Sequence, residues 1–121
     1  MYPGGGEEEN LVDSYYDPKD LDRFSTVGDH SSELFESFMK WYSSVFADGA
    51  LTQREKRLIA LAVAHAVQCP YCIDSYTQGC LEEGCSMEQL TEAIHVAAAI
   101  RGGASLIHGV QACNVADRLR M

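Results

Sequence analysis

The sequence predicts an all-α protein, a bundle of about six helices, and two observations carry this prediction. Helix-capping signals at Thr52 and Ser86 each precede a run in which apolar residues recur three and four positions apart. No segment shows the sustained alternation of polar and β-branched apolar residues that is typical of strands. With 121 residues, 46% of them hydrophobic, the chain fits one domain with its own core.

The first segment, residues 1–16, differs in composition from the rest of the chain. It is rich in Gly and Glu and ends in aromatic residues. We expect a flexible arm in which Tyr15 and Tyr16 dock on a neighbour. Residues 17–121 then form the helical domain.

Each predicted helix has its own start and stop signals. Ser, Thr and Asp cap helix starts, Pro suits the first turn, and Gly ends helices. In chain order, we expect helices from Asp17 to about Phe24, Ser31 or Ser32 to Gly49, Thr52 to Val67, Pro70 to about Glu83 with Gly84 as the stop, Ser86 to Gly102-Gly103, and about Ala104 to Leu119. The second helix carries an aromatic face, expected to be core or subunit interface, at Phe35, Phe38, Met39, Trp41 and Tyr42.

The net charge and the composition restrict the kinds of molecule that the chain is expected to bind. A net charge of −9 argues against nucleic acid, whose phosphates would be repelled. No apolar run reaches membrane-spanning length without a His, Arg or Gly in it, so we expect no membrane contact. The N-terminus has neither a basic start nor an apolar core. We therefore expect a cytoplasmic protein whose five cysteines are catalytic, metal-binding or buried.

The most informative motif is Cys69-Pro70-Tyr71-Cys72, which follows an apolar helical run. Positions i and i+3 lie on one face of a helix, so the two sulfurs can approach bonding distance. Pro70 suits a first helical turn, which puts Cys69 at or near the N-cap. The free amides and the helix dipole there favour a thiolate. The motif therefore predicts a redox dithiol.

Two alternatives for the motif are a half zinc site completed by Cys80 and Cys85, and plain packing. Cys80 lies eight residues beyond Cys72, roughly 12 Å along one helix, and one tetrahedral metal cannot hold both ends of that span. We expect no metal and no cofactor. Cys80, Cys85 and Cys113 are expected to be small buried hydrophobes.

Side chains around the motif are candidates for moving a proton. Tyr76 lies one turn after Cys72 on the same face, where its hydroxyl could donate to a thiolate or a substrate oxygen, or belong to the core. His95 is the first choice as proton shuttle because its helix is the expected packing partner of the Cys-x-x-Cys helix. Its alternative is a ring satisfied by a carbonyl. Lesser candidates are His65 and His108 for proton transfer, and Arg57 and Arg101 for holding an anion or a thiolate.

These residues carry a family resemblance over about half of the chain, from residue 51 to 109. The chain there resembles the carboxymuconolactone decarboxylase / alkylhydroperoxidase D (AhpD-like) superfamily. The matching features are Arg57–Val63, the Cys69/Cys72 pair and the capped helix ending in Glu92–Ala97. Ala64–Asp74 and Ala99–Ala104 are similar to a branch of arsenosugar-biosynthesis-associated peroxidase-like proteins. The resemblance implies an all-helical fold assembling as trimers or hexamers. It also implies either peroxidase activity through Cys-x-x-Cys or lactone chemistry without it.

The resemblance further implies that Cys72 attacks the oxidised substrate and that Cys69 resolves it as an intramolecular disulfide. The family relay has a Glu twelve residues before the motif and a His four residues after its second Cys. Here these positions hold Arg57 and Tyr76. Without both groups, the Cys72 thiolate depends on the helix N-terminus and any nearby cation, and its expected pKa is about 7.

We therefore expect a thiol-dependent, peroxidase-like oxidoreductase that reduces a peroxide or another oxidised small molecule with Cys69 and Cys72, assisted by Tyr76 and His95. A protein or low-molecular-weight thiol would re-reduce the disulfide, and the chain would act as a homo-oligomer. One alternative is a non-catalytic oligomeric or redox-responsive binding protein in an arsenic-related pathway. Another is an enzyme similar to the carboxymuconolactone decarboxylases.

Overall fold

The computed structural model describes residues 15–120, and within them every regular element is helical, which confirms the all-α class. The expected arm at residues 1–16 lies almost entirely outside the described residues. Five helices are present over this range rather than about six. They are the 3₁₀ helix η2 (Pro18–Gly28) and the α-helices α1 (Ser32–Phe46), α2 (Gln53–Val67), α3 (Pro70–Glu82) and α4 (Met87–Arg120).

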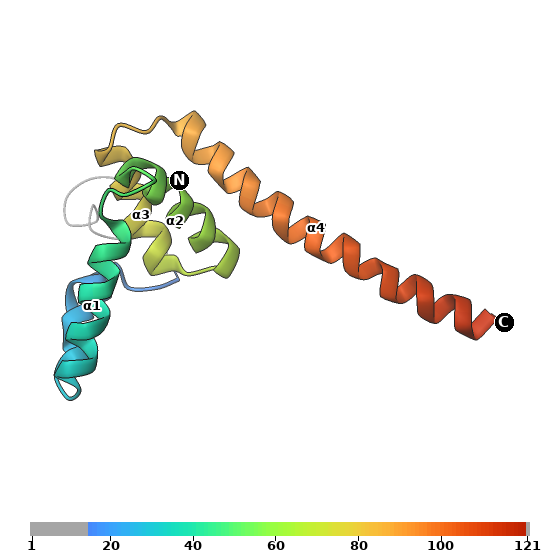
Figure 1. Ribbon diagram of the computed structural model, residues 1–121, viewed down its shortest axis with the longest axis horizontal. Coiled ribbons are helices and arrows are strands. Elements are labelled where there is room, and N and C mark those ends of the chain that lie inside the picture. Colours follow the sequence, from blue (N-terminus) through green and yellow to red (C-terminus); the bar gives the residue numbers. More distant parts are fainter. Residues whose placement is uncertain (1–14, 121) are drawn as a thin grey trace.

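Helix α2 is the centre of the fold, because both α3 and the first half of α4 pack against it. The core between these helices is small: Leu61, Cys80, Cys85 and Leu90 are buried together, with Leu58 and Tyr76 packed on them. Helices η2 and α1 pack on each other and project to one side of this core (Figure 1). They reach the rest mainly through contacts of η2 with α3 and of α1 with α2.

The capping signals form as predicted. The Thr52 hydroxyl accepts from the Glu55 amide (3.1 Å), and the Glu55 carboxylate accepts from the Thr52 amide (2.8 Å). At the start of α4, the Ser86 hydroxyl accepts from the Gln89 amide (3.2 Å), and the Gln89 side-chain oxygen accepts from the Ser86 amide (2.8 Å). Gly84, with φ +80°, ends the turn after α3. These local bonds fix where α2, α3 and α4 begin and end.

Two expected boundaries are wrong. The first helix is a 3₁₀ helix that continues past Phe24 to Gly28. The expected break at Gly102-Gly103 does not occur, because α4 runs without interruption to Arg120. A helix tolerates an internal glycine at a cost of about 1 kcal/mol relative to alanine, and the flanking residues, many of them Ala, favour continuation.

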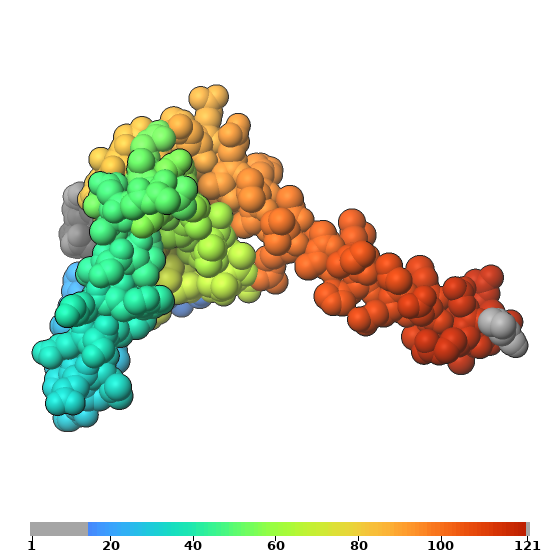
Figure 2. Space-filling model, in the orientation of Figure 1, coloured from blue at the N-terminus to red at the C-terminus, as the bar shows by residue number. Residues whose placement is uncertain are grey.

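The second half of α4 leaves the body of the molecule (Figures 1 and 2). From residue 98 to 120 every residue except Ala116 is exposed. By length and composition alone α4 could cross a membrane, although almost none of its most apolar window is buried. The His, Arg and Gly residues that break the apolar run in the sequence therefore do not break helix α4. The apolar side chains of this second half of α4 have no cover among the described residues.

Candidate redox site

The Cys-x-x-Cys pair lies at the turn from α2 into α3. Gln68 ends α2 in the left-handed conformation (φ 59°), which redirects the chain so that Cys69 becomes the N-cap of α3 and Pro70 its first residue. The Cys69 sulfur accepts from the Cys72 amide at 3.3 Å. The two sulfurs are 2.9 Å apart, and both thiols are free and half-buried. The predicted N-cap position and the approach of the two thiols are confirmed.

The surroundings of the two thiols shift their pKa values in opposite directions. The hydrogen bond with the Cys72 thiol holds the pKa of Cys69 below its ordinary value, and the backbone amides of Cys72 and Tyr71 lower this pKa further. Burial acts in the opposite direction and raises it. Burial first, then the hydrogen bond and charge of Cys69, raises the pKa of Cys72 to about 11. The expected pKa of about 7 for Cys72 is therefore wrong: the helix N-terminus acts on Cys69, whereas Cys72 lies one turn further inside.

The pair opens into a cavity of about 1000 Å³ between η2, α1 and α3. Tyr76, the predicted site residue, lines this cavity and stacks on Phe46, with ring centroids 5.3 Å apart and planes 16° apart. It also packs on the core, so the site and core interpretations of Tyr76 both hold. The cavity is further lined by side chains from all three helices, among them Asp20, Phe24, Val27, Phe38, Met39, Tyr42, Tyr71 and Asp74.

Tyr42 is a site residue that the sequence did not predict. It comes from α1, on the face expected to be core or interface, and it lines the cavity with both cysteines. Burial, followed by the charges of Cys72 and Cys69, raises the pKa of Tyr42. The phenol thus stays protonated and remains a hydrogen-bond donor. Only the helical spacing of Tyr42 with Phe38 and Met39 marked it in the sequence, and that pattern is equally typical of core.

Two tyrosine–aspartate bonds tie the N-terminal segment to α3. Tyr71 donates to Asp20 at 2.9 Å, and Tyr16 donates to Asp74 at 2.5 Å. The Tyr16 and Tyr71 rings meet edge to face at 4.8 Å. Burial and the bond to Asp74 raise the pKa of Tyr16 to about 12. Tyr16, which was expected to dock on a neighbour, contacts α3 of its own chain and thereby helps hold η2 as a wall of the cavity.

His95 does not join the pair within one chain. It is exposed on α4, and it is not among the described residues that line the cavity. The reason for choosing it was wrong, because α4 packs along α2 rather than along α3. His65 and His108 each contact a carbonyl one turn earlier, that of Leu61 at 2.9 Å and that of Ala104 at 2.7 Å. These two rings fit the alternative of a satisfied helix histidine.

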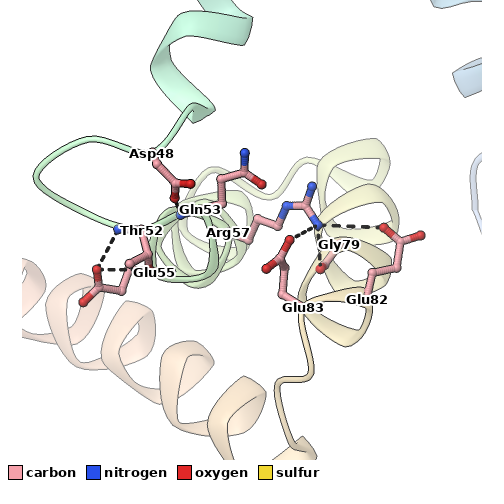
Figure 3. A network of polar contacts seen from close by, with 8 residues as sticks. All are labelled: Asp48, Thr52, Gln53, Glu55, Arg57, Gly79, Glu82 and Glu83. Atoms are coloured by element: carbon pink, nitrogen blue, oxygen red, sulfur yellow. Dashed lines mark hydrogen bonds and ion pairs between the residues drawn. The ribbon is translucent and has the colours of Figure 1, made fainter.

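Arg57, which occupies the position of the family Glu, belongs to the far end of α3. It donates to the Gly79 carbonyl at 3.0 Å and pairs with Glu83 at 3.3 Å and Glu82 at 3.8 Å (Figure 3). It therefore ties α2 to the last turn of α3 and neutralises carboxylates there. Arg101, on α4, donates to the Ala66 carbonyl and so caps the C-terminal end of α2.

The remaining cysteines divide into two kinds. Cys80 and Cys85 are buried in the core, as expected, and burial raises the pKa of Cys80 to about 11. Cys113 is exposed on α4, so the expectation that it is buried is wrong for the single chain.

Among the comparisons with known proteins, the family profile and one solved structure name the same family. The profile of the carboxymuconolactone decarboxylase family matches residues 32–114. "Uncharacterized protein 4 in cox locus" of Paracoccus denitrificans is 48% identical over 88 residues, which cover 73% of this chain and 79% of that protein. A crystal structure of a Methanobacterium thermoautotrophicum protein has a TM-score of 0.66 at 36% identity, covering 69% of this chain and 93% of its own. Apo-lpg0406, a carboxymuconolactone decarboxylase family protein from Legionella pneumophila, has a TM-score of 0.65 at 32% identity, covering 78% and 86%.

Proposed function

Because the chain belongs to the carboxymuconolactone decarboxylase family, as the match over residues 32–114 shows, we propose that it is a thiol-dependent oxidoreductase of the AhpD-like kind. Its Cys69 and Cys72 would reduce a peroxide or another oxidised small molecule. The observation that supports this most directly is the pair itself. Two free thiols lie 2.9 Å apart at a helix N-terminus and face an open cavity.

The proposed reaction transfers two electrons from the dithiol to the oxidant. The pair closes to a disulfide, and a thiol reductant then restores it by exchange through a mixed disulfide. The reaction needs no cofactor, because both electrons come from the two sulfurs. The cavity walls are mainly apolar, with carboxylates at Asp20, Asp22 and Asp74, which suits an uncharged organic oxidant.

A second candidate function is a non-catalytic, redox-responsive binding protein. It is favoured by Arg57 and Tyr76, which stand where the family relay has a Glu and a His. Such a protein would form the disulfide once without sustained turnover.

The test is consumption of cumene hydroperoxide with dithiothreitol as reductant. We expect the wild type to turn over and the Cys69→Ser/Cys72→Ser double variant to lose about a hundredfold or more of the rate. Cys113→Ser, which removes an exposed cysteine outside the cavity, is the matched control and should keep the wild-type rate. Intact mass should show the loss of two hydrogen atoms on oxidation. Equal consumption by wild type and double variant, with no disulfide, would support the binding protein instead.

We also propose that the chain is a homo-oligomer, a trimer or hexamer, whose copies cover α4. Val96, Ile100, Ile107 and Val110 are all exposed. With Gly103 they follow a spacing of four, three, four and three residues. This is the seam of a helix that packs along another helix. The exposed part of α4 therefore presents an apolar stripe that a second copy of the helix could cover.

Sedimentation should find an oligomer at micromolar concentration that Ile107→Glu dissociates, since the charge falls in the centre of the stripe. Ser105→Glu, on the opposite side of α4, should leave the assembly intact. A wild-type monomer would overturn this proposal, and flotation of that monomer with lipid vesicles would identify a membrane as the cover of α4.

A further inference from the structure

We propose that the Tyr42 phenol donates the proton to the leaving oxygen of the oxidant when the thiol pair attacks it. This inference rests on the redox function proposed above and adds a catalytic residue to it. The observations that carry it are the place of Tyr42 on a wall of the thiol cavity, the packing that holds its ring, and the availability of its hydroxyl.

The Tyr42 ring is fixed on the α1 wall of the cavity. Tyr42 is half-buried and lines the cavity together with Cys69 and Cys72. Its ring lies between those of Phe38 and Phe46, with centroids 5.7 and 5.0 Å away. Phe46 in turn stacks on a ring of α3. Because the ring is held along α1 and joined to α3, it keeps its place beside the pair without a hydrogen bond from its hydroxyl.

The Tyr42 hydroxyl is available to a bound molecule. Within residues 15–120 it has no hydrogen-bond partner. No polar side-chain atom of this part of the chain is fully buried without a partner, so solvent reaches this hydroxyl. A protonated phenol can donate one hydrogen bond and can give up its proton to a stronger base.

The cavity offers few other groups that can supply this proton. No histidine is among the described residues that line it. The Tyr71 hydroxyl already donates to Asp20 at 2.9 Å, and the guanidinium of Arg23 does not give up a proton in proteins. Tyr76 is the competing donor. Its ring packs on the buried core, and it lies on the same helix as Cys72.

The direction of the displacement favours Tyr42 over Tyr76. When a sulfur attacks one oxygen of a peroxide, the other oxygen leaves on the side away from the sulfur, with the reacting atoms aligned. The cysteines lie at the start of α3, whereas Tyr42 belongs to α1, another wall of the same cavity. A donor on another wall can meet the leaving oxygen, while a donor on α3 approaches from the side of the sulfur.

The electrostatics of Tyr42 support this assignment. Burial, followed by the charges of Cys72 and Cys69, raises the pKa of Tyr42. Negative charge on the pair therefore acts on this hydroxyl, and the phenol keeps its proton until a stronger base forms beside it. An alkoxide is a stronger base than a phenolate, so the proton transfer to the leaving oxygen is favourable.

The steps balance with Tyr42 and the two thiols. One thiolate of the pair attacks the terminal oxygen of the hydroperoxide; the S–O bond forms and the O–O bond breaks. The inner oxygen keeps the electron pair of that bond, takes the Tyr42 proton and leaves as an alcohol. The phenolate then takes the proton of the second thiol. The new thiolate attacks the sulfenic sulfur, the S–S bond forms, and the hydroxide leaves as water with a proton from solvent.

The test compares two oxidants that differ in their need for this proton. Tert-butyl hydroperoxide leaves as an alkoxide, whereas peracetic acid leaves as acetate, a weak base that needs no proton. The reduced protein, in a Cys113→Ser background, is mixed with each oxidant at pH 7, and mass spectrometry follows the Cys69–Cys72 disulfide. Tyr42→Phe should slow the reaction with tert-butyl hydroperoxide about a hundredfold and that with peracetic acid by less than about threefold.

The peracetic acid rate is the internal control, because damage to the fold or to the thiols slows both oxidants alike. Tyr76→Phe, which removes the competing hydroxyl, should leave the ratio of the two rates as in the wild type. No loss in Tyr42→Phe, an equal loss with both oxidants, or a selective loss in Tyr76→Phe instead overturns the inference and leaves the proposed function intact. A wild type that reacts with neither oxidant overturns the proposed function, and the role of Tyr42 with it.

Discussion

Replacement of Arg57 by glutamate, the residue found at this position in the family relay, is expected to lower the free energy of unfolding by about 2 kcal/mol. The Gly79 carbonyl would lose its guanidinium donor, and the new carboxylate would face Glu82 and Glu83. Peroxide consumption should not rise. Gly79 lies seven residues beyond Cys72, roughly 10 Å along α3, so a side chain held there does not reach the thiol pair.

The matched control for this prediction is Arg57→Gln, which has the shape of glutamate without its charge. It should cost about half as much, because an amide can still donate to the Gly79 carbonyl and adds no repulsion. Urea denaturation followed by circular dichroism compares the three proteins. A glutamate variant as stable as the wild type would show that the Arg57 contacts do not hold α2 to α3.

The helix starts were predictable because their causes are local. Thr52 with Glu55, and Ser86 with Gln89, satisfy amides within four residues, so the sequence contains all the interacting groups. The same holds for Cys69, whose N-cap position follows from the proline after it. These elements set the all-α class and the position of the thiol pair.

The features that were missed depend on contacts between distant segments or on competing local effects. Gly102-Gly103 is a local stop signal that the rest of α4 overrides. His95 was assigned to the site through a packing partner, and which helix α4 meets is not a local property. Tyr42 reaches the cavity only because α1 packs on η2, which in turn packs on α3.

Restoring the missing histidine at position 76 should accelerate the attack of Cys72 on a peroxide. In a Cys69→Ser background, Tyr76→His is expected to accelerate attack by Cys72 on cumene hydroperoxide about a hundredfold, within the range of a positioned general base. Residue 76 lies one turn after Cys72 on the same side of α3 and lines the cavity with it. A neutral imidazole there can take the Cys72 proton, so the rate should rise with pH through about 6 to 7 as the ring loses its own proton.

Tyr76→Phe in the same Cys69→Ser background is the control, because it keeps a ring against Phe46 and the core but offers no base. It should remain as slow as Cys69→Ser alone. Dimedone trapping measures the attack, and thermal melts followed by circular dichroism correct for any loss of folded protein. Equal rates for the histidine and phenylalanine variants would mean that residue 76 does not reach the Cys72 sulfur. A gain confined to the histidine variant would show that the missing base keeps Cys72 protonated.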